Sequence, residues 1–68
     1  MVNENQAQAI ADLMETAIPE GSEPANVMKA AAIIMAHTVA HFEHKNDAAK
    51  IAVGFLKCYV KIETGIKL

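Results

Sequence analysis

The segment 24–44 constrains the fold most, because a helix formed there is apolar nearly all round. Its large apolar side chains do not keep to one side at the helical period, and alanines fill the positions between them. These large side chains belong to Val27, Met28, Ile33, Ile34, Met35, Val39 and Phe42. A helix of this kind is buried on several sides in a folded protein. The segment therefore needs more covering surface than an ordinary amphipathic helix does.

A first helix is predicted over residues 3–18, before this apolar segment. Its apolar residues recur at helical spacing on one face, while acidic and amide residues occupy the other. Pro19 and Gly21 are expected to end it. Ser22 is a suitable N-cap for the helix that follows, and Pro24 suits that helix's first turn.

A third helix is predicted over residues 47–64. Asn46 can take the left-handed conformation that ends a helix, and Asp47 can cap the next one, so we expect a break at 45–47. One continuous helix through this point is the alternative. Gly65 is expected to end the third helix. Its apolar residues form two stripes: Ile51, Phe55, Cys58 and Ile62 in one, and Val53, Leu56 and Val60 in the other.

The sequence predicts an all-α fold, a small three-helix domain over residues 1–68. In a monomeric three-helix bundle each helix can be polar on roughly half of its surface. The second and third helices of this chain are apolar on more than one side and do not have a polar half. With only 68 residues, of which 53% are hydrophobic, the chain gains most by sharing its core with a second copy. We therefore predict a homodimer built on the hairpin of the second and third helices. Its predicted core contains Ile33, Ile34, Met35, Phe42, Phe55 and Leu56.

Composition argues against several classes of protein. The formal net charge is −2 and all six basic residues are lysines, whereas nucleic-acid recognition favours arginine and a positive surface. The apolar run at 30–42 contains two histidines and is shorter than the ~20 residues that cross a bilayer. A single cysteine, Cys58, and no signal-peptide pattern predict a reducing cytoplasm. We expect no nucleic-acid or membrane partner.

All three histidines lie in the stretch HTVAHFEH, as His37, His41 and His44. If the second helix runs to residue 44, they share one of its faces and form a candidate site for a metal ion, a small ligand or pH sensing. Strong metal signatures are absent. Histidines near a helix C-terminus also stabilise it through the helix dipole, and this structural interpretation is favoured.

A narrow polar stripe on the third helix is the candidate surface for a protein partner. It contains Lys50, Lys57 and Lys61, with Gly54 between them. A glycine inside a helix costs about 1 kcal/mol relative to alanine, so it invites an explanation such as close approach of a partner backbone. The simpler alternative is a solvated lysine face. Tyr59 is added to this surface because tyrosine is enriched at interfaces.

No catalytic constellation can be argued, and no cofactor is implied. Cys58 lies on an apolar stripe, where a buried cysteine is inert. We expect a non-enzymatic interaction module that acts as an inhibitor, adaptor or regulator. A small-ligand or metal-binding protein and a structural assembly unit are the alternatives. In general type, the chain resembles small accessory proteins of bacteria and their phages, a likeness that assigns no residue a role.

Overall fold

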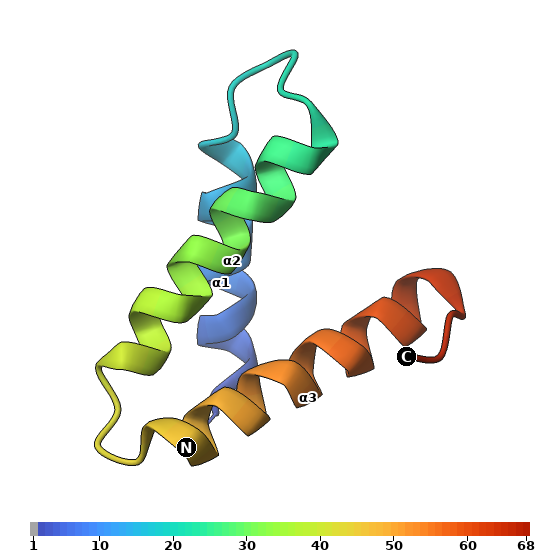
Figure 1. The fold of residues 1–68 in the computed structure, drawn as a ribbon. Helices are drawn as coiled ribbons and strands as arrows, with labels where there is room; N and C mark the ends of the chain where they lie inside the picture. The colour runs from blue at the N-terminus through green and yellow to red at the C-terminus, as the bar shows by residue number, and fades with distance from the viewer. Residues whose placement is uncertain (1) are drawn as a thin grey trace.

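Three α-helices form the structure, a computed structural model that describes residues 2–68 (Figure 1). Helix α1 spans Glu4–Thr16, α2 spans Pro24–Ala40 and α3 spans Lys45–Thr64. The described residues contain no strand. The predicted all-α class and its three helices are therefore confirmed.

Helix α1 begins with a side-chain cap. The Asn3 side-chain oxygen accepts a hydrogen bond from the backbone N–H of Gln6 at 3.0 Å. This satisfies one of the amide groups that have no partner in the first turn. On the polar face, the Gln8 amide donates to the Asp12 carboxylate at 3.0 Å, one helical turn further on.

The turn between α1 and α2 departs from the prediction in two respects. Helix α1 ends at Thr16, before Pro19 is reached, and Gly21 adopts a positive φ of 81°. The N-cap of α2 is Glu23, so Ser22 as cap is wrong. The Ser22 hydroxyl instead donates to the Pro19 carbonyl at 2.6 Å and stabilises the turn itself. Pro24 in the first turn of α2 is confirmed.

The break between α2 and α3 is confirmed, but it lies four residues earlier than predicted. Helix α2 ends at Ala40, and α3 already begins at Lys45. The predictions that Asn46 ends the second helix and that Asp47 caps the third are wrong, since both residues lie in the first turn of α3. Lys45 contributes to the break because its ammonium group donates to the Phe42 carbonyl at 3.1 Å. At the other end, Gly65 terminates α3 in the left-handed conformation, as predicted, with φ 76°.

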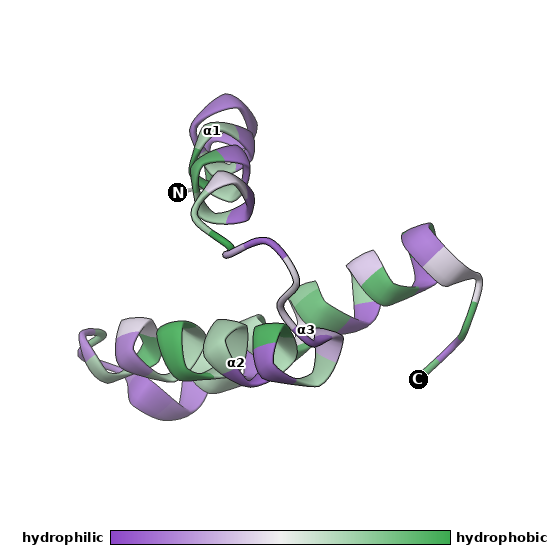
Figure 2. Cartoon of the chain, turned by 90° about the horizontal axis from the view of Figure 1, so that it is seen from above, coloured by the Kyte–Doolittle hydropathy of each residue, from purple (hydrophilic) through white to green (hydrophobic). Residues whose placement is uncertain are grey.

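The three helices are splayed, so they do not form a closed bundle. Helices α2 and α3 form a V whose corner is the loop that joins them (Figure 1). Helix α1 overlaps α2 in Figure 1 but stands apart from it in the view from above (Figure 2). No Cα atom of α1 comes within 8 Å of α2 or α3. In packed helix pairs the axes lie about 8–10 Å apart, which brings Cα atoms much closer than this.

Very little of the chain is buried. Ala48, near the corner of the V, is the only buried residue among those described, at 5% exposure. A folded monomer of 7.3 kDa exposes about 4,200 Å². This chain exposes 6193 Å², which is about 2,000 Å² above that expectation. The radius of gyration of 13.0 Å likewise exceeds the roughly 11 Å expected for 68 residues.

Candidate interaction surface

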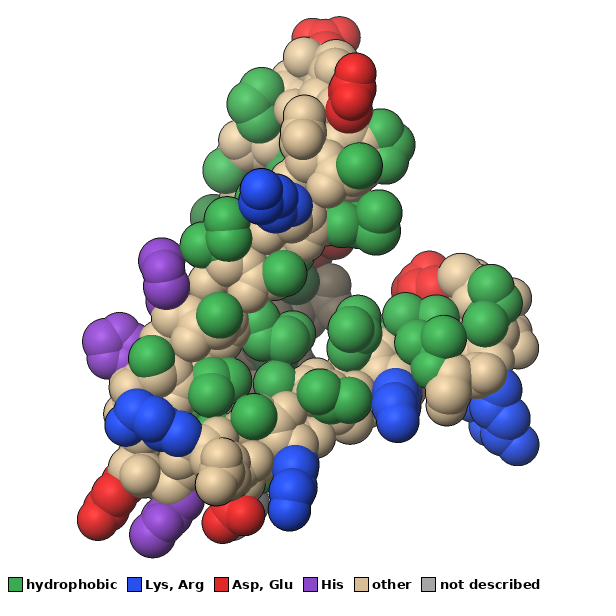
Figure 3. All heavy atoms as spheres, in the orientation of Figure 1, with side chains coloured by type: hydrophobic (Ala, Val, Ile, Leu, Met, Phe, Trp, Pro, Cys, Tyr) green, Lys and Arg blue, Asp and Glu red, His purple; other side chains and the backbone are tan. Residues whose placement is uncertain are grey.

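Large hydrophobic side chains from all three helices are exposed at the surface. Hydrophobic side chains gather along the inner edges of the V between α2 and α3 (Figure 3). The six residues predicted to form a dimer core all retain large exposed fractions, from 38% to 53%: Ile33, Ile34, Met35, Phe42, Phe55 and Leu56. Within one chain, therefore, these residues form no core. Contact between them and a second copy remains a prediction.

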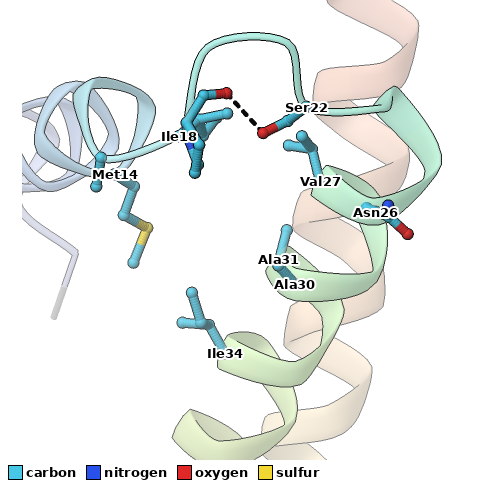
Figure 4. Close-up of a pocket in the computed structure, with 10 residues that line it drawn as sticks. Met14, Ile18, Ser22, Asn26, Val27, Ala30, Ala31 and Ile34 are labelled. Carbon is cyan, nitrogen blue, oxygen red and sulfur yellow. Dashed lines mark hydrogen bonds between the residues drawn. The ribbon is translucent and has the colours of Figure 1, made fainter.

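A groove of about 420 Å³ separates α1 from α2. Met14 and Ile18 point into it from the α1 side, while Val27, Ala31 and Ile34 face them from α2 across open space (Figure 4). Ala30 also lines the α2 wall. The small alanine side chains allow the backbone of an entering helix to approach closely.

Sequence reasoning identified the apolar face of α1 but not this groove. The groove depends on how far the seven-residue turn holds α1 from α2, and side-chain periodicity carries no information on that separation. The available signal was that α1 and α2 both present apolar residues next to a short connection. That signal predicts contact between the two helices, whereas the structure keeps them apart.

A second groove, of about 330 Å³, lies between the N-terminal part of α1 and the middle of α3. Ala7 and Ala11 line it from α1, and Phe55 and Tyr59 line it from α3. Tyr59 is 53% exposed. Tyr59 therefore lines an apolar groove together with Phe55. The sequence prediction had grouped it with the lysine stripe, whose surroundings are different.

The lysine stripe of α3 is open to solvent. Lys50, Lys57 and Lys61 are exposed, and lysine side chains follow the lower edge of α3 in Figure 3, away from the hydrophobic edge. Gly54 is exposed as well, and a methyl group added there would meet no atom within 4 Å. No neighbour among residues 2–68 therefore requires glycine at this position.

The three histidines do not share one face of a helix. Because α2 ends at Ala40, only His37 lies in that helix, in its last turn. His41 is the C-cap residue of α2, and His44 is the N-cap residue of α3. All three are exposed. Among residues 2–68 no three His, Cys, Asp or Glu side chains are grouped so that they could hold a metal ion.

Cys58 is exposed in this chain. The prediction of a buried cysteine is therefore wrong for a single copy. Its stripe lies on one side of α3, and Phe55 of this stripe faces another helix, α1, across the second groove. Ile51 and Ile62 of the same stripe are 55% and 67% exposed.

Comparisons with protein-family models, curated proteins and solved structures find no match to this chain. No helix within residues 2–68 is both long enough and apolar enough to cross a membrane.

Proposed function

We propose that this chain is a non-enzymatic protein–protein interaction module that folds as a homodimer and acts on another protein as an inhibitor, adaptor or regulator. The observation that supports this most directly is the surface left uncovered, on which many large hydrophobic side chains are exposed. One chain exposes about 2,000 Å² more than a folded monomer of its mass. Two such chains could bury about 4,000 Å² together, within the roughly 2,000–5,000 Å² range of obligate homodimers.

Helix α1 supports the same proposal. It has 13 residues and no backbone neighbour within 8 Å in the other helices. Isolated helices shorter than about 12–15 residues are marginal in water, even with favourable sequences. Its asparagine cap contributes only about 1 kcal/mol. Stable helix formation at Glu4–Thr16 therefore calls for packing that a single chain does not supply.

The proposed site for the second protein is the lysine stripe formed by Lys50, Gly54, Lys57 and Lys61. Tyr59, which lines the second groove instead, is a separate candidate contact. The lysines of the stripe lie on the opposite edge of α3 from the hydrophobic side chains (Figure 3), so dimerisation through the apolar faces can leave them free. Ammonium groups around a glycine suit an acidic partner whose backbone approaches closely. Such contacts weaken with added salt.

Two measurements test this function. Sedimentation equilibrium should give twice the 7.3 kDa chain mass, whereas an open series of larger species would favour the structural assembly unit. Capture from an extract of the source organism then compares the wild-type chain with Gly54→Leu. The control is Ala9→Leu, at an exposed alanine of α1 that lines neither of the two apolar grooves.

We expect the wild-type chain and Ala9→Leu to retain the same protein and Gly54→Leu to lose it while remaining a dimer. Equal retention by all three chains would remove the lysine stripe from the candidate surfaces. Loss of the dimer in Gly54→Leu would place the stripe in the homodimer interface and contradict its role in binding another protein.

A further inference from the structure

We infer that the groove between α1 and α2 is the docking site for α3 of a second copy of this chain. The inference rests on the proposed homodimer and specifies its contact. The inserted surface is the apolar stripe Ile51, Phe55, Cys58 and Ile62. Each copy would give its α3 to the other and receive one in return, which forms a closed two-fold assembly.

The separation of α1 from α2 leaves an open apolar groove that can receive the side chains of another helix. No Cα atoms of the two helices approach within 8 Å, and the volume between them is about 420 Å³. Its walls carry Met14 and Ile18 on one side and Val27, Ala30 and Ile34 on the other. The apolar walls match an apolar helix face, and the alanines permit the close approach that helix packing requires.

Helix α3 is the segment available to fill the groove. It approaches α2 mainly near the corner of the V, and its C-terminal half projects away from the rest of the chain (Figure 1). The stripe remains largely exposed: Phe55, which also lines the second groove, is 45% exposed, Ile62 is 67% exposed and Cys58 is exposed. A chain's own α3 leads away from its groove, so a second copy is the source of the occupant.

Charge favours the same pairing. Helix α1 contains three acidic and no basic residues, whereas α3 contains four lysines and two acidic residues. The formal charges are therefore −3 on α1 and +2 on α3. Packing α1 against a second α1 brings like charges together, whereas docking the apolar stripe of α3 beside the α1 of another copy avoids this repulsion and can leave the lysine stripe exposed.

The groove can be blocked by a charge on its α2 wall. Ala30→Glu places a carboxylate in the groove. Ala36→Glu is the matched control, because Ala36 is exposed and does not line the groove. Ala36 also lies two helical turns after Lys29, which is the one Lys, Arg, Asp or Glu residue of α2. We expect Ala30→Glu to raise the dimer dissociation constant by about 100-fold or more, since an unpaired buried charge is strongly unfavourable. Ala36→Glu should remain dimeric.

A mixing experiment separates loss of the contact from simple misfolding. Ile62→Lys damages the inserted stripe and leaves the groove intact, whereas Ala30→Glu damages the groove and leaves the stripe intact. Each variant alone should sediment as a monomer. An equimolar mixture should recover dimer mass, because the heterodimer holds one unaltered groove with one unaltered stripe and places the new lysine near the new glutamate.

The outcomes distinguish this inference from the proposed function. If the wild-type chain is a monomer, the proposed homodimer fails. If the wild-type chain is a dimer and Ala30→Glu is equally dimeric, the dimer stands and the groove is not its interface. If the mixture recovers no dimer, reciprocal insertion of α3 is refuted, and contacts between identical surfaces, or closure of α1 onto its own α2, account for the loss.

Discussion

Dilution is the perturbation to which a folded homodimer of this chain should respond most clearly. The isolated chain buries only Ala48 among its described residues, and α1 lacks tertiary packing. Folding and association are therefore expected to be one process, in which two unfolded chains form one folded dimer. The stability of such a dimer depends on protein concentration by mass action.

The size of the effect follows from the unfolding enthalpy. At about 0.7 kcal/mol per residue near 60 °C, two chains of 68 residues give about 95 kcal/mol per dimer. For that enthalpy, a 100-fold dilution lowers the melting temperature by about 10 °C. A smaller enthalpy, as expected for loosely packed helices, would increase the shift.

Circular dichroism at 222 nm measures this directly, with melting curves at about 100 µM and about 1 µM in cells of different path length. The helical signal at low temperature should also fall in the most dilute samples, because α1 loses the surface that stabilises it. A melting temperature independent of concentration, together with a cooperative transition and a monomer mass, would refute the reasoning from exposed area.

Three substitutions test individual features of the helices. Gly54→Ala should stabilise each chain by about 1 kcal/mol, since the added methyl group meets open space, and urea unfolding should show this as a higher midpoint; destabilisation would mean that a neighbouring copy approaches the backbone there. Gly65→Ala should cost about 1 kcal/mol, because φ 76° disfavours residues with a Cβ atom, and an unchanged urea midpoint would contradict the capping role. Asn3→Ala should reduce the free energy of unfolding by about 1 kcal/mol, because it removes the N-cap hydrogen bond from Gln6. Increased hydrogen exchange confined to the first turn of α1 would report this loss, and unchanged exchange would mean that the cap is not formed.

The helices could be predicted from the sequence because their signals are local. Apolar periodicity identified the first and third segments, and an apolar composition on nearly all sides identified the second. The identities of Pro24 and Gly65 fixed one start and one end. The predicted helix boundaries near residues 40–45 were wrong because several residues there are suited to helix ends. Asn46 and Asp47 are common at helix termini, but in the structure His44 is the N-cap residue and the Lys45 ammonium donates to the Phe42 carbonyl.

That boundary error determined the interpretation of the histidines. A helix extended to residue 44 places His37, His41 and His44 on one face, whereas a helix that ends at Ala40 leaves two of them outside it. Side-chain spacing has meaning only within one continuous helix. The groove between α1 and α2 could not be predicted for a related reason, since it depends on the distance between helices and not on the pattern within either one.

The two sides of α2 explain why closing the V would not complete a monomeric core. Val27 and Ala30 line the groove toward α1, whereas Met28 and Ala32 do not line it. Each residue turns the helix by about 100°, so Ala32 lies on nearly the opposite side from the centre of that groove wall. A three-helix bundle has one centre and covers one contiguous face of each helix. Even a tightly closed bundle would therefore leave one apolar side of α2 in water, and Met28 is already 68% exposed. A second copy supplies the missing surface, because its α3 can cover the groove side of α2, which no other helix of the same chain approaches closely.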